Sequence, residues 1–143
     1  DINCALGLSQ IGKIDYFLKY RKNIYLKYLT ELKNFNTNLV ITEYSKNIRP
    51  SFHLFVINIF FDKLTRNKNH FMKYLLDHKI IAQQHYIPIY KFSVYNEKVI
   101  SYNNSELYIK NSVSLPIYVG LDKKKQERII KIIKSYFAIK KKK

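Results

Sequence analysis

The sequence has 143 residues, which suits one domain, since single domains cluster at about 100 to 150 residues. Hydrophobic residues make up 47% and charged residues 25%, which excludes disorder over most of the length, and no apolar run is long enough to span a bilayer. The single cysteine, Cys4, excludes an internal disulfide and a thiolate zinc site. We therefore expect a protein of the cytoplasm with no membrane partner.

The charge is strongly positive, with 26 basic against 10 acidic residues and a formal net charge of +16. Such a charge often indicates nucleic-acid binding, but 22 of the basic residues are Lys and only 4 are the Arg that base and phosphate recognition favours. Lys, Ile, Asn and Tyr, whose codons are rich in A and T, supply 68 of the 143 residues, so genome composition explains much of the charge. We expect no nucleic-acid partner and keep a Lys-rich nucleic-acid-binding module as the lesser alternative.

The first predicted element is a long helix over residues 5–33, where apolar residues recur at steps of three and four. It exceeds the usual length of a globular helix, so we expect it to connect two bodies or to pack along a partner. Two polar stretches follow, 34–38 and 46–50, and these predict loops. Between them, residues 39–42 form a candidate short strand.

A central strand is predicted over residues 52–61, because β-branched and aromatic residues occupy both alternating sets. Helical spacing then predicts a helix over 65–79, followed by a short strand over 80–84. Pro88 ends that strand and imposes an extended segment.

The last third of the chain predicts a short helix over 105–110, a strand over 112–115 and a turn at Gly120. Asp122 is a plausible N-cap for a final helix with an apolar stripe. The order of these elements predicts an α+β fold, in which a long N-terminal helix precedes a small mixed sheet backed by helices.

The candidate sites are few. The three glycines stand too far apart for a phosphate-binding loop, and the four histidines lack the spacing of metal ligands. His70 and His78 share a predicted helix and are expected to be structural. His53 lies in the alternation of the predicted central strand, which favours a hydrogen-bonded histidine near the sheet end.

The segment after the predicted strand 80–84 is the best candidate for a binding site, because scaffolds place functional groups where strands run into loops. It brings together several polar side chains in one short stretch: Gln84, His85, Tyr86 and Tyr90. The alternative is that the tyrosines pack and His85 is merely exposed. No catalytic dyad or triad can be assembled from sequence neighbours, so no residue is assigned a catalytic role.

Four stretches, in order, resemble the C-terminal part of the DegT/DnrJ/EryC1/StrS family of pyridoxal-phosphate-dependent sugar aminotransferases. Residues 1–10 resemble the family's D-I-Q-A-A-L-G-L-x-Q helix, with Asn3 in place of Gln and Cys4 in place of Ala. The other three resemble its YHLYVI, VHYxPIY and SLPxYxGL segments and lie at 51–57, 84–90 and 114–121. Together they cover nearly the whole chain.

The resemblance implies the small C-terminal domain of a fold-type I enzyme. Residues 1–36 would form the interdomain helix and 37–143 the small α+β domain, with the cofactor domain absent from this chain. In the family, the lysine that binds pyridoxal phosphate and the groups that hold its ring precede the stretch where this sequence begins. We therefore expect no bound cofactor, no cofactor-binding residue and no metal site in this chain, and no activity from it alone.

The resemblance also implies a function. It is strongest to members that move an amino group from glutamate to the C4 keto group of a UDP-4-keto-6-deoxy-N-acetylhexosamine, in cell-surface polysaccharide synthesis. The implied partner is the nucleotide-sugar substrate, lined by Gln84, His85, Tyr86 and Tyr90, and the complete protein would be a homodimer. The alternative is a truncated, non-catalytic remnant of the same family.

Overall fold

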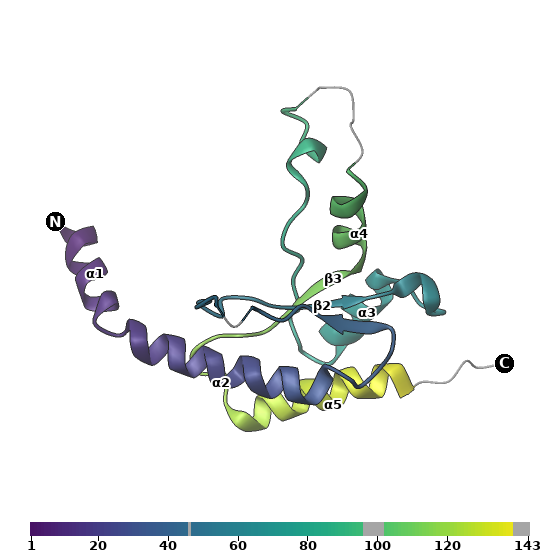
Figure 1. Cartoon of the computed structure of the whole chain (residues 1–143), viewed down its shortest axis with the longest axis horizontal. Coiled ribbons are helices and arrows are strands. Elements are labelled where there is room, and N and C mark those ends of the chain that lie inside the picture. The colour runs from purple at the N-terminus through teal and green to yellow at the C-terminus, as the bar shows by residue number, and fades with distance from the viewer. Residues whose placement is uncertain (46, 96–101, 139–143) are drawn as a thin grey trace.

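The computed structural model describes residues 1–45, 47–95 and 102–138. Its elements, shown in Figure 1, are α1 (Ile2–Ile11), α2 (Ile14–Leu32), β1 (Leu39–Ile41), β2 (Phe55–Ile59), η1 (Phe61–Lys63), α3 (Lys68–Asp77), η2 (Ile89–Lys91), α4 (Asn103–Asn111), β3 (Ser112–Leu115) and α5 (Lys123–Ala138). Here η marks a short 3₁₀ helix. The α+β class is confirmed.

The three strands pair in the order β1, β2, β3, and the predicted central strand is indeed in the middle. Both pairings are antiparallel. We expected a mixed sheet, but within the described residues no parallel pair forms. The predicted strand over 80–84 contributes only one antiparallel bridge, between Gln83 and Ser114, because the chain leaves the sheet directly after it and runs towards Pro88.

The core lies on one face of the sheet. Phe55, Ile57 and Ile59 of β2 are completely buried, whereas the alternate residues Val56 and Asn58 are only half-buried. The composition of this strand predicts cover on two faces, and the structure covers the second face only in part. Figure 1 shows α2 and α5 side by side beneath the sheet, and the ring of Tyr28 in α2 lies 4.8 Å from that of Phe55. The helices therefore cover the apolar face of β2.

The predicted long helix is two helices. It is interrupted at Gly12 and Lys13, between α1 and α2. Glycine is a weak helix former, at a cost of about 1 kcal/mol relative to Ala, and no packing opposes the break, since every residue of α1 is exposed. Figure 1 shows α1 projecting from the rest of the molecule at an angle to α2.

The predicted boundary at residue 36 stays a prediction. The C-terminal half of α2 is part of the core, with four buried residues: Ile24, Tyr25, Tyr28 and Leu32. The exposed helix α1 carries large apolar side chains, among them Ile2, which is 86% exposed. The two ends of the predicted helix thus differ in their surroundings.

Two side-chain caps fix helix starts. Asn67 accepts a hydrogen bond from the backbone N–H of His70 at 3.0 Å, at the first turn of α3. The predicted cap at Asp122 is confirmed, because its Oδ1 accepts a hydrogen bond from the N–H of Lys125 at 2.8 Å. This carboxylate sets the point where the chain enters α5.

Tyr28 offers a test of how α2 holds the loop after β3. Its side chain is fully buried, and its hydroxyl donates a hydrogen bond to the carbonyl of Pro116 at 3.0 Å. Tyr28→Phe keeps the ring and removes the donor, so we expect the free energy of unfolding to fall by about 1 kcal/mol in urea titrations. The exposed Tyr16 supplies the control Tyr16→Phe, which should change it little. Equal effects of the two changes would contradict the assignment.

Candidate functional site

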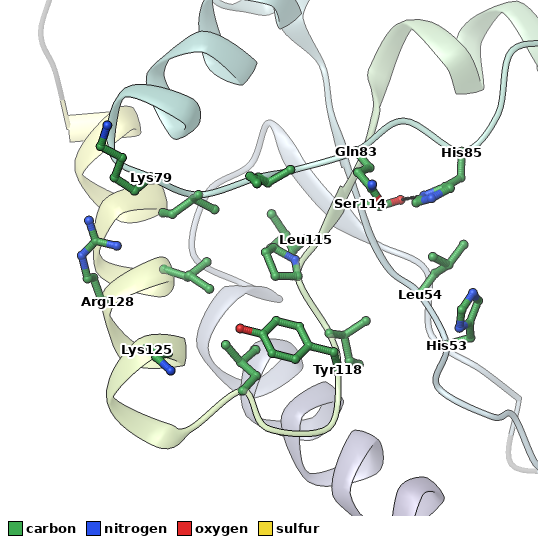
Figure 2. A pocket seen from close by; sticks show the side chains of 16 residues that line it. His53, Leu54, Lys79, Gln83, His85, Ser114, Leu115, Tyr118, Lys125 and Arg128 are labelled. Atoms are coloured by element: carbon green, nitrogen blue, oxygen red, sulfur yellow. Dashed lines mark hydrogen bonds between the residues drawn. The ribbon is translucent and has the colours of Figure 1, made fainter. Parts of the chain in front are cut away.

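The main cavity of the described structure has a volume of about 610 Å³. It lies between four parts of the chain: the segment 79–85, the end of β3 with the loop that follows it, the first two turns of α5, and residues 53 and 54 before β2 (Figure 2). Its volume falls within the range of about 300 to 1,000 Å³ that is typical of ligand sites. The isolated bridge between Gln83 and Ser114 closes one side, since it joins the first part to the second.

His85 is the one predicted site residue that lines this cavity. It is half-buried, and its Nδ1 lies 2.9 Å from the hydroxyl oxygen of Ser114 in β3. Backbone hydrogen bonds in both directions between Gln83 and Ser114, at 3.0 and 2.8 Å, bring the two side chains together. Because this contact occupies Nδ1, the nitrogen that could contact a ligand is Nε2.

The other three predicted residues lie outside the cavity lining. Tyr86 is 70% exposed and packs edge-on against His85, with ring centroids 4.8 Å apart. Gln84 is exposed. Tyr90 lies on η2, further along the arm that residues 84–95 and α4 form away from the sheet (Figure 1). The structure thus brings His85 and Tyr86 together and separates them from Tyr90, and the assignment of the four as a substrate site stays a prediction.

Tyr90 is bound to α4. Its hydroxyl donates to Glu106 Oε1 at 2.7 Å, and Lys91 donates to Oε2 at 2.6 Å. The hydrogen bond from Lys91, followed by that from Tyr90, lowers the pKa of Glu106. Partial burial and the bond to the carboxylate raise the pKa of Tyr90 to about 12, so this tyrosine stays neutral at physiological pH. The contacts join the two sides of the arm.

Sequence reasoning missed most of the cavity wall. Lys79, Lys125, Arg128 and Tyr118 line it. For this wall, the sequence shows a local positive charge only in the three lysines at 123–125. It could not show that this part of α5 lies beside the segment that follows α3. His53 also lines the cavity and is exposed, contrary to the expected hydrogen-bonded position in a strand, because β2 begins two residues later.

Lys125 at the cavity does not fit a covalent bond to pyridoxal phosphate. Such a bond needs an amine that is easily deprotonated. Lys125 has the opposite character, because the hydrogen bond to Asp122 and the charge of that group raise its pKa. Burial lowers the pKa of Lys68 to about 8, but Lys68 is not part of this lining, and its amine donates to the carbonyl of Ile109 at 2.7 Å.

The other histidines have structural partners, as expected. His70 Nδ1 lies 3.3 Å from the hydroxyl of Tyr136, and His78 Nδ1 lies 2.8 Å from the carbonyl of Tyr74. In the described ranges, no three His, Cys, Asp or Glu side chains come close enough to hold a metal ion. A helix that is long and apolar enough to cross a membrane is likewise missing from the part of the chain that was described.

Comparison with known proteins decides the family. The profile of the DegT/DnrJ/EryC1/StrS aminotransferase family matches residues 1–134. The chain belongs to this family. The resemblance of the four motifs is thereby confirmed, and with it aminotransferase membership at the level of the family. Solved structures with a similar fold include the PLP form and the PMP form of the sugar aminotransferase Spr1654 from Streptococcus pneumoniae.

Two curated relatives from Campylobacter jejuni strains are UDP-4-amino-4,6-dideoxy-N-acetyl-beta-L-altrosamine transaminases. They are 32% and 30% identical to the chain over 129 and 128 residues, which is 87% of this chain and 33% of each relative. The solved structure of Helicobacter pylori PseC, an aminotransferase involved in the biosynthesis of pseudoaminic acid, is 25% identical with a TM-score of 0.84. The aligned region covers 94% of this chain and 37% of the PseC chain. The chain thus spans about a third of the family members that it matches.

Two serines of β3 form a matched pair for testing the position of His85. Both are buried, but only Ser114 contacts His85, and within the described structure the hydroxyl of Ser112 has no hydrogen-bond partner. We expect Ser114→Ala to lower the free energy of unfolding by about 1 kcal/mol and to shift the ring ¹⁵N signals of His85 in NMR spectra. Ser112→Ala should do neither. Unchanged His85 signals in Ser114→Ala would contradict the contact.

Proposed function

We propose that the chain is the C-terminal part of a pyridoxal-phosphate-dependent aminotransferase that moves an amino group from glutamate to the C4 keto group of a UDP-4-keto-6-deoxy-N-acetylhexosamine. Family membership supports the reaction class. The two Campylobacter jejuni relatives, both UDP-4-amino-4,6-dideoxy-N-acetyl-beta-L-altrosamine transaminases, support the choice of sugar. In the complete enzyme the cofactor supplies the electron sink, and we assign its binding to parts outside residues 1–143.

The role of this chain is to form one wall of the substrate site. The observation that carries this role is the position of His85 at a cavity of about 610 Å³, held by Ser114, with a second ring nitrogen left for a ligand. A neutral or protonated imidazole can bind the hydroxyl and carbonyl groups of a sugar. Tyr86, in contact with the His85 ring, would border the same wall, while Gln84 and Tyr90 would support it from the arm.

Two further properties complete the proposal. The complete protein would be a cytoplasmic homodimer, and the exposed apolar side chains of α1 agree with a helix that is covered in a larger assembly. Nucleotide sugar is the only small-molecule partner that we assign. A non-catalytic remnant of the family and a nucleic-acid-binding module are the outcomes that the following experiments would reveal instead.

The test uses a chimera, because the chain matches only about a third of the length of its relatives. Residues 1–143 replace the matching C-terminal third of the Campylobacter jejuni transaminase, and the two half-reactions are followed separately. We expect transfer from glutamate to the keto sugar. In His85→Ala, kcat/KM for the sugar nucleotide should fall about tenfold to a hundredfold, the loss expected for one polar contact of about 1.4 to 2.8 kcal/mol. The glutamate half-reaction should change little.

The control is His70→Ala, which removes an exposed imidazole that lies against Tyr136 and keeps the backbone bond to Asn67. It should leave both half-reactions intact. A His85 that serves only the fold would give equal losses in both half-reactions with a lowered melting temperature, and this pattern would remove the substrate-wall assignment. A chimera that folds, as judged by its melting curve, but transfers no amino group would indicate the non-catalytic remnant.

A second experiment addresses the cofactor. The chain of 143 residues is mixed with pyridoxal phosphate, reduced with borohydride and digested for mass spectrometry. Since Lys125 holds its proton firmly and Lys68 is engaged with Ile109, we expect only sparse labelling spread over many lysines. One lysine labelled stoichiometrically would show that the chain binds the cofactor itself.

A further inference from the structure

The arm is a long excursion from the sheet. It leaves after Gln83 and returns through α4 to β3, and Figure 1 shows it projecting away from the strands. At its base, Gln83 and Ser114 exchange two backbone hydrogen bonds of 3.0 and 2.8 Å. Long connections are more mobile than the elements that they join. A second point of attachment therefore decides how firmly the segment after Gln83 is held.

Glu106 of α4 provides this second attachment. Its Oε1 accepts a hydrogen bond from the hydroxyl of Tyr90 at 2.7 Å, and its Oε2 accepts one from the amine of Lys91 at 2.6 Å. The ring of Tyr90 also packs against that of Tyr102, with centroids 5.2 Å apart. We call Tyr90, Lys91 and Glu106 the clamp. It joins η2 to α4, so the arm is closed at its base and again further out.

The protonation states suit the clamp. The hydrogen bonds from Lys91 and Tyr90 lower the pKa of Glu106, so its carboxylate is ionised at neutral pH and both oxygens accept. Tyr90, whose pKa is raised to about 12, keeps the proton that it donates. Hydrogen bonds to an ionised acceptor are stronger than those between neutral groups. One carboxylate thus holds two adjacent residues of η2.

Packing does little to hold the residues between the two attachments. Tyr86, Ile87 and Ile89 are 70%, 53% and 64% exposed, so no core fixes their side chains. The ring of Tyr86 contacts that of His85, which is bonded in turn to β3. Pro88 limits the backbone through its fixed φ. The polar contacts at the two ends therefore decide where His85 and Tyr86 lie.

A binding segment that is ordered in advance binds its ligand more tightly. A ligand that meets loose side chains uses part of its binding free energy to order them, and each such side chain weakens binding by about twofold to tenfold. Glu106 lies outside the cavity lining. It can therefore act on a bound sugar only through the segment that it holds.

We propose that Glu106 is a positioning residue for the sugar site. It holds Tyr90 and Lys91, so that His85 and Tyr86 are ordered beside the cavity before a ligand binds. The ordering of this segment rests on the clamp alone. Its effect on the keto sugar rests on the function proposed above.

The first experiment measures order in the chain of 143 residues. Backbone ¹⁵N relaxation gives order parameters for the amides of Tyr86, Ile87 and Ile89. We expect values of about 0.85 in the unaltered chain and below about 0.6 in Glu106→Ala, which is the range of flexible backbone. The melting temperature should change little, because the ion pair with Lys91 is exposed.

The matched control is Glu31→Ala, which removes an exposed ion pair of 2.7 Å with Lys134 of α5, outside the arm. It should leave the three amides unchanged. Glu106→Gln should loosen them less than Glu106→Ala, because its amide oxygen can still accept from Tyr90. Tyr90→Phe should add little to Glu106→Ala, because both changes remove the same contact.

The second experiment uses the chimera. Glu106→Ala should raise KM for the sugar nucleotide about twofold to tenfold. The value of kcat and the glutamate half-reaction should change little, because bound substrate restores the order of the segment. Glu106→Gln should give an intermediate KM. In a His85→Ala background, Glu106→Ala should have little further effect, because the side chain that it positions is gone.

Order parameters that are unchanged in Glu106→Ala, or that fall equally in Glu31→Ala, would overturn the clamp. Equal losses of kcat in both half-reactions, with a lowered melting temperature, would leave Glu106 only a structural role and overturn the positioning role. The two proposals fail separately. If the chimera transfers no amino group while Glu106→Ala still loosens residues 86–89, the proposed function is wrong and the clamp stands. If the chimera is active and sensitive to His85→Ala, but Glu106→Ala leaves its KM unchanged, the positioning role is wrong and the function stands.

Discussion

The buried face of β2 is the constraint on which the rest of the structure depends. Phe55, Ile57 and Ile59 are wholly removed from water, in a core cluster that also contains buried residues of α2, α3 and α5. With these helices fixed, β3 has a set position beside β2, and the segment that ends at Gln83 can reach the outer edge of β3 at one point only. The cavity is the space left between that segment and α5.

Helix α2 also fixes the cavity loop directly. Tyr20 donates to the carbonyl of Leu121 at 3.2 Å, and Tyr28 donates to that of Pro116 at 3.0 Å. The two tyrosines are eight residues apart, so both lie on the same side of the helix. Their hydroxyls bind the two ends of the loop between β3 and α5. Burial raises the pKa of Tyr28, so this hydroxyl remains a donor throughout the physiological range. The residues that pack the core thus also set the shape of the site.

The sequence predicted those features that depend on local pattern. The strand over 112–115, the middle position of the strand around Phe55 and the cap at Asp122 follow from alternation and capping, which are short-range properties. The break at Gly12 went unpredicted because apolar spacing continues across it, and only the absence of packing around α1 lets a single glycine end the helix. The segment 80–84 has the composition of a strand, but it pairs with β3 through a single antiparallel bridge, between Gln83 and Ser114. His85 could be proposed from a strand end, whereas Lys79 and Arg128 lie far apart in the sequence and come together only in the fold.

Arginine at position 128 can make a combination of contacts that lysine could not make. The chain uses Lys for 22 of its 26 basic residues, so Arg is the exception in its composition. The guanidinium of Arg128 donates to the carbonyl of His78, the residue that caps the C-terminus of α3, and still presents donors on its other edge. A lysine ammonium that made the same contact would present its remaining protons from a single point. The planar fork lets one side chain tie the end of α3 to α5 while its other N–H groups remain at the cavity wall, so the residue that holds this wall together also lines the site.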